Sequence, residues 1–310
     1  MRGTLQPVAN TLSKLKAEKK LTQTQKRSIA PYCKDASGFS DFKYVFEVDQ
    51  SPIGKTSRSC PATYVKIFDN IRKVFAQLPE AQIRGFSAGR FSFNNAEGQC
   101  PDCKGNGSIK LEMDFLPSTR IPCETCRGDR YNPATLTVLY KGKTIADVLK
   151  MSIGEAAEFF SSHPKLSRTL KLLAETGLEY LQIGQPSQTL SGGEAQRLKL
   201  VTELTKGRVK ENGTKALNKN IYLIEEPSIG LHLNDIRKLI DVLHRLTDEG
   251  HTVVVVEHHP ALMAEADHIL DFGPEAGPNG GIICAQGSPE EVAQSQDSTT
   301  APFLRQTLNS

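Results

Sequence analysis

Residues 190–197 read Leu-Ser-Gly-Gly-Glu-Ala-Gln-Arg, and residues 221–227 read Ile-Tyr-Leu-Ile-Glu-Glu-Pro. A pair of glycines that opens a helix leaves backbone N–H groups exposed at the positive end of the helix dipole, which suits a phosphate group. Ser191 is placed to cap this helix, with Glu194 as its capping-box partner. The second stretch predicts an apolar strand that ends in two carboxylates, which suit a metal ion and a water molecule beside a phosphoanhydride.

The spacing of apolar residues predicts alternating strands and helices around these stretches. Strands are expected at 44–48, 220–225, 252–257 and about 268–272, with a helix between the second and the third. The unbroken run from Val253 to Val256 is typical of a parallel strand buried on both faces. Residues 144–180 predict three helices, and residues 135–140 alternate like a further strand. The sequence therefore predicts an α/β fold with a largely parallel sheet.

Four of the seven cysteines form two Cys-x-x-Cys pairs: Cys100 with Cys103, and Cys123 with Cys126. Thiolates at this spacing can close a tetrahedral Zn²⁺ site, and four sulfur ligands leave no position for water, so a structural zinc is predicted. A basic residue and a glycine follow each pair, and the glycine lets backbone amides turn toward the thiolates. The other cysteines are interpreted as small apolar residues: Cys33, Cys60 and Cys284.

Basic side chains surround the cysteine pairs: Lys104, Lys110, Arg120, Arg127 and Arg130. They fit either a solvated face or a surface that contacts nucleic-acid phosphates, and three are the candidate DNA-binding residues: Lys104, Arg127 and Arg130. The net charge of +3 is too small to indicate nucleic acid by itself. No stretch approaches the ~20 apolar residues that span a bilayer, and the N-terminus lacks a signal peptide's apolar core, so a cytoplasmic protein without membrane contact is expected.

The ends of two predicted strands carry the candidate catalytic groups. Glu226 is predicted to orient or activate water, and Glu225 to hold Mg²⁺ through a water molecule. His258 follows the next strand, beside the end of the Glu226 strand, where it would contact a γ-phosphate. The sequence therefore predicts phosphoanhydride chemistry at this edge of the sheet.

A phosphate-binding loop of the pattern G-x-x-x-x-G-K-[ST] is missing from the sequence. Gly54-Lys55-Thr56 follows a predicted strand, but Asp49 stands where the pattern needs its first glycine. Gly142-Lys143-Thr144 fails in the same way, because Thr137 stands there. The chain is therefore expected to be unable to hold ATP by itself.

These motifs resemble one family, UvrA, the damage-recognition ATPase of bacterial nucleotide excision repair, over about residues 44–292. The matching stretches are both cysteine pairs and residues 48–54, 89–94, 140–144, 190–197, 230–232, 256–258 and 271–274. The resemblance implies an ATP-binding-cassette (ABC) core with a helical signature subdomain and a zinc module. It also implies these roles: Gln50 as the Q-loop residue, Ser191, Gly192 and Gly193 as the signature loop, Glu225 as the Walker B acid, Glu226 as the catalytic glutamate and His258 as the switch histidine.

The domain boundaries expected from the motifs and the resemblance follow the chain in six parts. They are a loosely ordered N-terminal segment (1–43), the Q-loop strand and helix (44–84), the zinc module (85–134), the helical signature subdomain (135–189), the ATPase core (190–293) and a loose tail (294–310). Four positions differ from the usual family pattern. Glu225 stands for Asp, Ser228-Ile229 for Thr-Thr, and His259 for Asn.

UvrA-like proteins contain two ABC modules, and this chain is similar to the second, beginning after its Walker A loop. The resemblance implies that ATP with Mg²⁺ is shared in trans with a Walker-A-bearing UvrA-like chain or module. It also implies double-stranded DNA and the other excinuclease subunits as partners. Either a complete gene product or a fragment would begin in this way.

Three other interpretations remain open. The chain could be a non-hydrolysing, zinc-stabilised DNA-binding or regulatory remnant of a UvrA-like protein. It could be a UvrA relative that confers ATP-dependent drug self-resistance. A zinc chaperone module of the DnaJ type shares the Cys-x-x-Cys-x-Gly pattern, but the presence of only two such pairs and the stretch at 190–197 argue against it.

Overall fold

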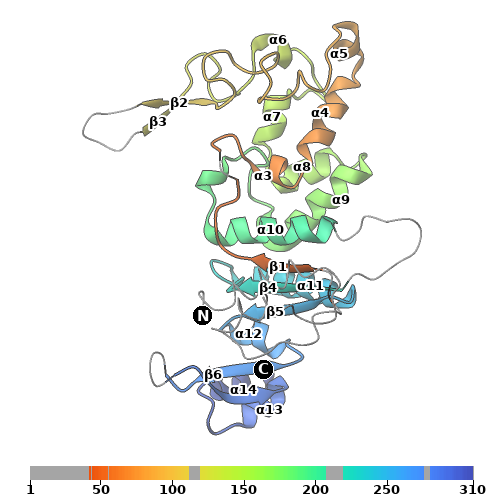
Figure 1. Cartoon of the computed structure of the whole chain (residues 1–310). Coiled ribbons are helices and arrows are strands. Elements are labelled where there is room, and N and C mark those ends of the chain that lie inside the picture. The colour runs from red at the N-terminus through yellow and green to blue at the C-terminus, as the bar shows by residue number, and fades with distance from the viewer. Residues whose placement is uncertain are drawn as a thin grey trace, which may run out of the picture. The chain divides into compact units, whose positions relative to one another are not determined.

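The computed structural model describes residue 42 and residues 44–54, 56–111, 119–206, 219–275 and 280–309. The chain divides into two units, one formed by residues 1–49 and 210–310 and the other by residues 50–209 (Figure 1). Apart from Phe42, the N-terminal segment expected to be loosely ordered lies outside the described residues. No helix in the described part of the chain is both long and apolar enough to cross a membrane.

A parallel three-stranded sheet in the order β1-β4-β5 forms the first unit's centre. It consists of β1 (Tyr44–Val48), β4 (Asn220–Glu225) and β5 (Thr252–Val256). Between β4 and β5 runs α11 (Leu233–Asp248), which contacts β5, as a crossover between parallel strands requires. The strands and the intervening helix expected from the sequence are thus confirmed.

The expectation that β5 is buried on both faces is wrong. Val254 is 46 % exposed and Val256 is 42 % exposed. Val253 and Val255 lie opposite Tyr222 and Ile224 of β4 and share their well-covered face. An all-valine run indicates a strand, because β-branched side chains favour strands. It does not indicate whether both faces of that strand are buried.

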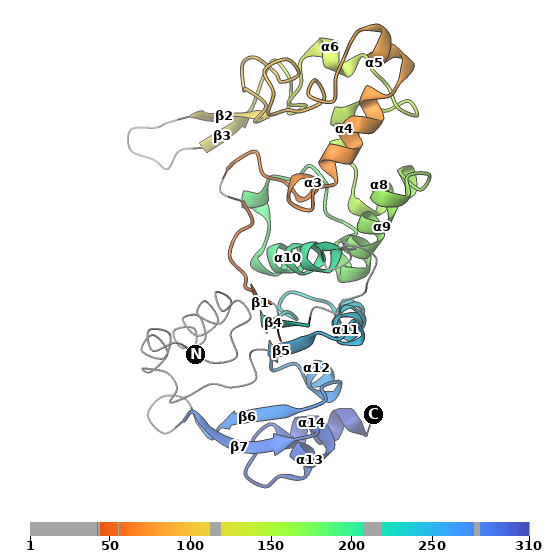
Figure 2. The ribbon, with the colours of Figure 1, turned by 45° about the vertical axis from the view of Figure 1, so that its right-hand side comes forward.

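The C-terminal part of the first unit is a two-stranded antiparallel sheet covered by helices (Figure 2). Its elements are α12 (Pro260–Ala264), β6 (Ile269–Gly273), β7 (Ile282–Gly287), α13 (Pro289–Gln294) and α14 (Ala301–Leu308). The expectation of a loose tail at 294–310 is therefore wrong, because residues 301–308 form a helix. Leu304 packs with Val292 and Ala293, and Ser298 and Thr300 donate hydrogen bonds to Asp271.

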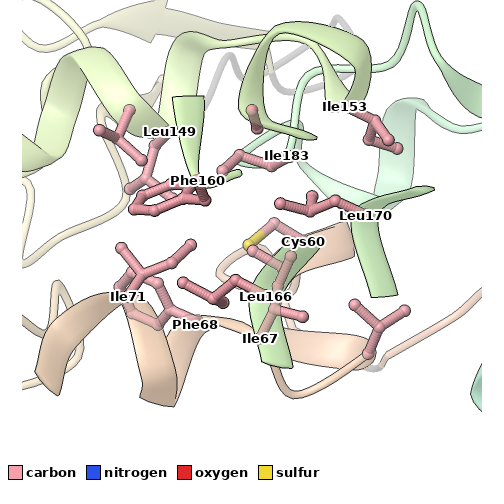
Figure 3. Close-up of a cluster of buried hydrophobic side chains, with 14 of the residues drawn as sticks. Cys60, Ile67, Phe68, Ile71, Leu149, Ile153, Phe160, Leu166, Leu170 and Ile183 are labelled. Atoms are coloured by element: carbon pink, nitrogen blue, oxygen red, sulfur yellow. The ribbon is translucent and has the colours of Figure 1, made fainter. Parts of the chain in front are cut away.

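The second unit is mostly helical. Its elements are α3 (Pro61–Tyr64), α4 (Phe68–Ala76), α5 (Pro79–Ile83), β2 (Ser108–Leu111), β3 (Thr119–Pro122), α6 (Pro133–Leu136), α7 (Ile145–Lys150), α8 (Ile153–Phe159), α9 (Pro164–Leu173), a π-helical turn η2 (Ala174–Leu178), a 3₁₀ turn η3 (Ser187–Thr189) and α10 (Gly192–Lys206). Figure 3 shows its core, where Phe68 and Ile71 of α4 face Phe160 and Leu166. Ala195, Leu198 and Val201 of α10 belong to the same core, which therefore holds the helix that begins with the glycine pair.

The three helices expected at 144–180 are confirmed as α7, α8 and α9. Capping boxes begin the first two, formed by Thr144 with Asp147 and by Ser152 with Glu155. The strand expected at 135–140 is wrong, because residues 133–136 form α6. The Asn132 side chain accepts a hydrogen bond from the backbone N–H of Thr135, so a local cap outweighs the alternating pattern.

The hairpin of β2 and β3 extends from the second unit and begins and ends beside the cysteine pairs (Figures 1 and 2). α10, which contains most of the Leu-Ser-Gly-Gly-Glu motif, also belongs to this unit. The expected boundaries place residues 190–206 in the ATPase core instead. β4, which ends at Glu225, and Glu226 directly after it belong to the first unit.

Candidate functional site

The four paired cysteines come together in one buried cluster. Their Sγ atoms all lie within 4.8 Å of one another, with 3.9 Å between Cys100 and Cys123 and 3.6 Å between Cys103 and Cys126. Zn–S bonds of ~2.3 Å in a tetrahedron place sulfurs about 3.8 Å apart. The antiparallel β2–β3 pairing joins the two loops, so the donor set and its spacing fit a single Zn²⁺.

The residues that follow each cysteine pair adopt left-handed backbone conformations. φ is 49° at Lys104 and 79° at Gly105 in the first loop, and 47° at Arg127 and 95° at Gly128 in the second. This turn lets the N–H of Gly107 donate a hydrogen bond of 3.2 Å to Cys103 Sγ. The two loops therefore repeat one geometry, which turns amide dipoles toward the sulfurs.

Backbone amides and burial act in opposite directions on the cysteine pKa values. The N–H of Cys126 lowers the pKa of Cys123 to about 7. Burial raises the pKa of Cys126 to about 12 and also raises that of Cys100. Four thiolates buried together therefore need a cation to balance their charge, which a bound Zn²⁺ would supply.

The basic residues around the cluster differ in exposure. Lys104 and Arg127 are exposed, and Lys110 and Arg120 lie opposite each other on the hairpin, also exposed. Arg130 is only 7 % exposed, and its guanidinium donates to the Gly184 carbonyl and lies over the Phe93 ring. The sequence-based choice of Arg130 as a DNA contact is therefore corrected: this side chain braces the cluster's loop from inside.

The acidic residues predicted to work on the phosphoanhydride stand at the carboxyl end of the parallel sheet. Glu225 ends β4 and lies opposite Val256, so Glu226 and His258 follow adjacent parallel strands. The His258 side chain is 76 % exposed. The structure thus places these three groups at one edge, in the first unit.

Glu226 has a backbone conformation that is rare for a residue with a side chain. Its φ is 45°, and its N–H donates a hydrogen bond of 2.7 Å to the Val256 carbonyl. Non-glycine residues in this region cost of order 1–3 kcal/mol and persist where the surroundings fix them, often at functional sites. The backbone of Glu226 is thus held against β5 directly after β4 ends.

Sequence reasoning missed the role of Glu257, whose side chain is 4 % exposed. Its Oε1 accepts hydrogen bonds from the Ser228 hydroxyl and from the N–H groups of His258 and His259, at 2.9, 2.9 and 3.1 Å. Its Oε2 accepts one from the Ser228 N–H at 3.2 Å. One carboxylate therefore ties the turn after Glu226 to the turn that carries His258. An acid within the Val-Glu-His stretch was the only sequence signal for it.

The glycine pair and Gln50 come together in the second unit. Ser191 Oγ accepts from the Glu194 N–H at 3.3 Å, while Glu194 Oε2 accepts from the Ser191 N–H at 2.7 Å, which confirms the capping box. A Cβ placed on Gly192 would lie 3.1 Å from the Cβ of Gln50. Gly192 therefore permits Gln50 to approach the start of α10, and Gly193 is buried behind it.

Tyr180 is a second residue that sequence reasoning missed. Its hydroxyl donates to Glu194 Oε1 at 2.6 Å. Burial opposes ionisation of Glu194, but hydrogen bonds from Tyr180 and Ser191 outweigh it and lower the pKa of this carboxyl. Burial and the Glu194 carboxylate raise the pKa of Tyr180 to about 12. A charged Glu194 is thus held in place at the helix start.

We expect one tightly bound Zn²⁺ per chain, lost when Cys123 is replaced by serine. Structural zinc sites have apparent binding free energies of ~10–16 kcal/mol, so losing one ligand should also unfold the cluster's loops. Metal analysis after chelator-free purification and proteolysis of the hairpin measure both effects. Cys284→Ser, outside the cluster, is the matched control. A Cys123→Ser chain that keeps a full equivalent of zinc would contradict the assignment.

We expect Glu257→Gln to destabilise the first unit by roughly 2–4 kcal/mol, because an amide accepts fewer hydrogen bonds and presents an N–H₂ group to N–H donors. Urea unfolding and amide exchange at Ser228 and His258 measure the loss. Glu265→Gln is the control, since the His244–Glu265 pair is exposed and should contribute under ~1 kcal/mol. Equal effects of the two changes would remove Glu257 from its positioning role.

Comparisons with known proteins agree with this architecture. No protein-family model matches the chain. It is 53 % identical over 271 residues to UvrABC system protein A of Aquifex aeolicus (strain VF5), covering 87 % of this chain and 28 % of the relative. It is 52 % identical to UvrABC system protein A of Micrococcus luteus, covering 89 % of this chain and 27 % of the relative. The crystal structure of UvrA2 from Deinococcus radiodurans matches with a TM-score of 0.78 and 47 % identity, over 86 % of this chain and 32 % of that one. The chain spans less than a third of the length of these relatives and, by sequence and fold over that portion, belongs to the UvrA family.

Proposed function

We propose that the chain acts as a UvrA-type excision-repair ATPase portion that binds double-stranded DNA. In this proposal, the acids of the first unit and the signature helix of the second contribute to ATP sites whose phosphate-binding loop comes from another UvrA-like module. Glu225 would hold Mg²⁺ through water, Glu226 would orient the attacking water, and His258 would contact the γ-phosphate. Gln50 and the loop Ser191 to Gly193 would close on nucleotide.

The arrangement of Glu226 is the observation that carries the proposal. Its left-handed backbone and the hydrogen bond to the Val256 carbonyl fix the main chain of a half-buried glutamate at the end of a central strand. Glu257 fixes the neighbouring turn with His258 at the same time. A preorganised carboxylate needs no reorganisation when water attacks, which is the usual source of catalytic power in phosphoryl transfer.

The DNA-binding part of the proposal rests on the exposed cations near the cysteine cluster. Lys104 and Arg127 occupy equivalent positions in the two loops, directly after the second cysteine of each pair. Loops held by a metal keep such charges at a fixed separation, which suits phosphates along a duplex. We propose contacts to the DNA backbone here and contacts to other excinuclease subunits elsewhere.

We expect this chain to hydrolyse little ATP alone and to hydrolyse it when mixed with a suitable partner. The partner is a UvrA-like module that carries a phosphate-binding loop but has its own catalytic glutamate replaced. Glu226→Gln should then reduce the shared turnover by ~10²- to 10⁴-fold, as loss of a base does. Steady-state phosphate release measures the rate.

The matched control for this experiment is Glu158→Gln, an exposed acid on α8. It should leave turnover unchanged. Robust hydrolysis by the chain alone that survives Glu226→Gln would place the active site elsewhere. Absence of turnover in the mixture, with DNA binding retained, would favour the non-hydrolysing remnant.

We expect the double change Lys104→Glu and Arg127→Glu to weaken duplex binding at every sequence. The slope of log K against log salt is negative, and each lost phosphate contact reduces its magnitude by ~0.9 for B-DNA. The magnitude should therefore decrease by about 2. Fluorescence anisotropy over a range of salt concentrations measures affinity and slope together.

The control for the DNA experiment reverses two other exposed cations, Lys165 and Arg168 of α9, which lies away from the hairpin in both views (Figures 1 and 2). It changes the net charge equally. If the two double variants bind duplex alike, then the cations beside the cysteines are only a solvated face.

A further inference from the structure

A polar hollow of about 560 Å³ lies between the loop that follows Gln50 and the first cysteine loop. Residues 56–59 line it with Thr63, Asn94 and Asn106. None of the lining residues carries a carboxylate, and one, Arg58, carries a positive charge. The lining thus offers hydroxyl, amide and guanidinium groups, which suit an anion and disfavour a cation.

Internal hydrogen bonds use some of these donors and leave others. Ser57 Oγ donates to Asn106 Oδ1 at 2.8 Å, and Thr63 Oγ1 donates to the Cys60 carbonyl. Thr56 Oγ1 and Ser59 Oγ lie 3.2 Å apart and share one hydrogen bond, so one of these two hydroxyl hydrogens remains.

The guanidinium of Arg58 is the main remaining donor. It forms no hydrogen bond or ion pair with any residue that the structure describes. The side-chain amide of Asn94 is likewise unused within the described ranges. A half-buried arginine without a carboxylate partner retains five N–H donors in a planar fork, the geometry that binds phosphate oxygens in pairs.

The loop is held in this shape from two sides. Gly54 has a φ of 74°, and a Cβ there would lie 2.4 Å from Ser59 Oγ, so only glycine permits this approach. On the other side, the Asn106 side chain donates to the Cys103 carbonyl at 2.9 Å. Ser57, Asn106 and Cys103 thereby connect the hollow to the cysteine cluster.

We infer that this hollow binds a phosphate group of the DNA backbone through Arg58, Asn94 and the Thr56–Ser59 hydroxyl pair. The inference rests on the proposed DNA-binding function and adds a site apart from the exposed loop cations. The exposed Lys104, two residues before Asn106, extends positive charge from the hollow along the cysteine loop. A strand of DNA that contacts Lys104 would present its successive phosphates along this line.

The test compares Arg58→Gln with Arg168→Gln in binding of a fluorescein-labelled, undamaged DNA duplex to the full chain. Arg168 is exposed on α9, so the control loses the same charge outside the hollow. We expect Arg58→Gln to weaken binding about fivefold to tenfold and to reduce the salt slope by about 1, as loss of one phosphate contact does. Arg58→Lys should restore the slope and part of the affinity, while Arg168→Gln should match the wild type.

Other outcomes separate the hollow from the function on which it rests. Equal binding by Arg58→Gln and Arg168→Gln, with wild-type melting temperatures and intact duplex affinity, would overturn this site and leave the DNA-binding proposal standing. No duplex binding by the wild-type chain would overturn both. Titration with a fluorescent ATP analogue identifies the phosphate source, because an effect of Arg58→Gln on the nucleotide and not on the duplex would overturn the assignment to DNA.

Discussion

The geometry of the acidic edge depends on one buried carboxylate. Glu257 accepts hydrogen bonds from the hydroxyl and N–H of Ser228 and from the N–H groups of His258 and His259. Parallel pairing of β4 with β5 sets the register of the strand ends, but it does not determine the backbone conformation of the turns that follow them. A nearly buried charge with several donors is costly to disturb, because each unmade bond exposes its full desolvation penalty. Glu257 therefore holds the backbone at His258 and the turn that follows Glu226, and the chemistry proposed for this edge depends on both turns.

In the second unit, the loops of the candidate site are held by a cluster of cysteine sulfurs instead of a buried carboxylate. Gln50, Ser191 and the polar hollow stand on loops, and the hairpin of β2 and β3 is too short to be stable by itself. The cysteine cluster joins both ends of that hairpin. Asn106 connects it to Ser57, because its side chain donates to the Cys103 carbonyl and accepts from the Ser57 hydroxyl. Arg130, with its guanidinium on the Gly184 carbonyl and the Phe93 ring, links the same cluster to the helical core. The cysteine cluster and the loops proposed to contact phosphate are thus parts of one structure.

Much of this arrangement follows from the sequence, and the exceptions have physical causes. Period and composition predict the parallel strands and α7 to α9, and cysteine spacing predicts the cluster, because these signals are local and strong. The strand predicted at residues 135–140 is wrong because Asn132 caps a short helix. This interaction of one side chain outweighs the alternating pattern of apolar residues. The polar stretch before residue 301 suggests a loose tail, yet Ala301 and Leu304 are buried and Ser298 and Thr300 bond to Asp271, so contacts with distant segments order it. The burial of Arg130 and the role of Glu257 depend on contacts between distant segments, which a single sequence does not encode as a pattern.

Two of the departures from the usual family residues keep a hydrogen-bonding role, whereas Ile229, which stands where threonine is usual, has no hydroxyl. Ser228 stands where threonine is usual, and its hydroxyl is the group that donates to Glu257. His259 stands where asparagine is usual, and its Nδ1 accepts from the Ala261 N–H to cap α12, the task that asparagine performs at helix starts. Both substitutions keep the donor or acceptor and change the rest of the side chain. The hydrogen bonds of Ser228 and His259 to Glu257 fit the hydrolysing proposal, because they hold the turns that follow Glu226 and carry His258. In that proposal Glu225, one methylene longer than the usual aspartate, would reach the metal through a water molecule.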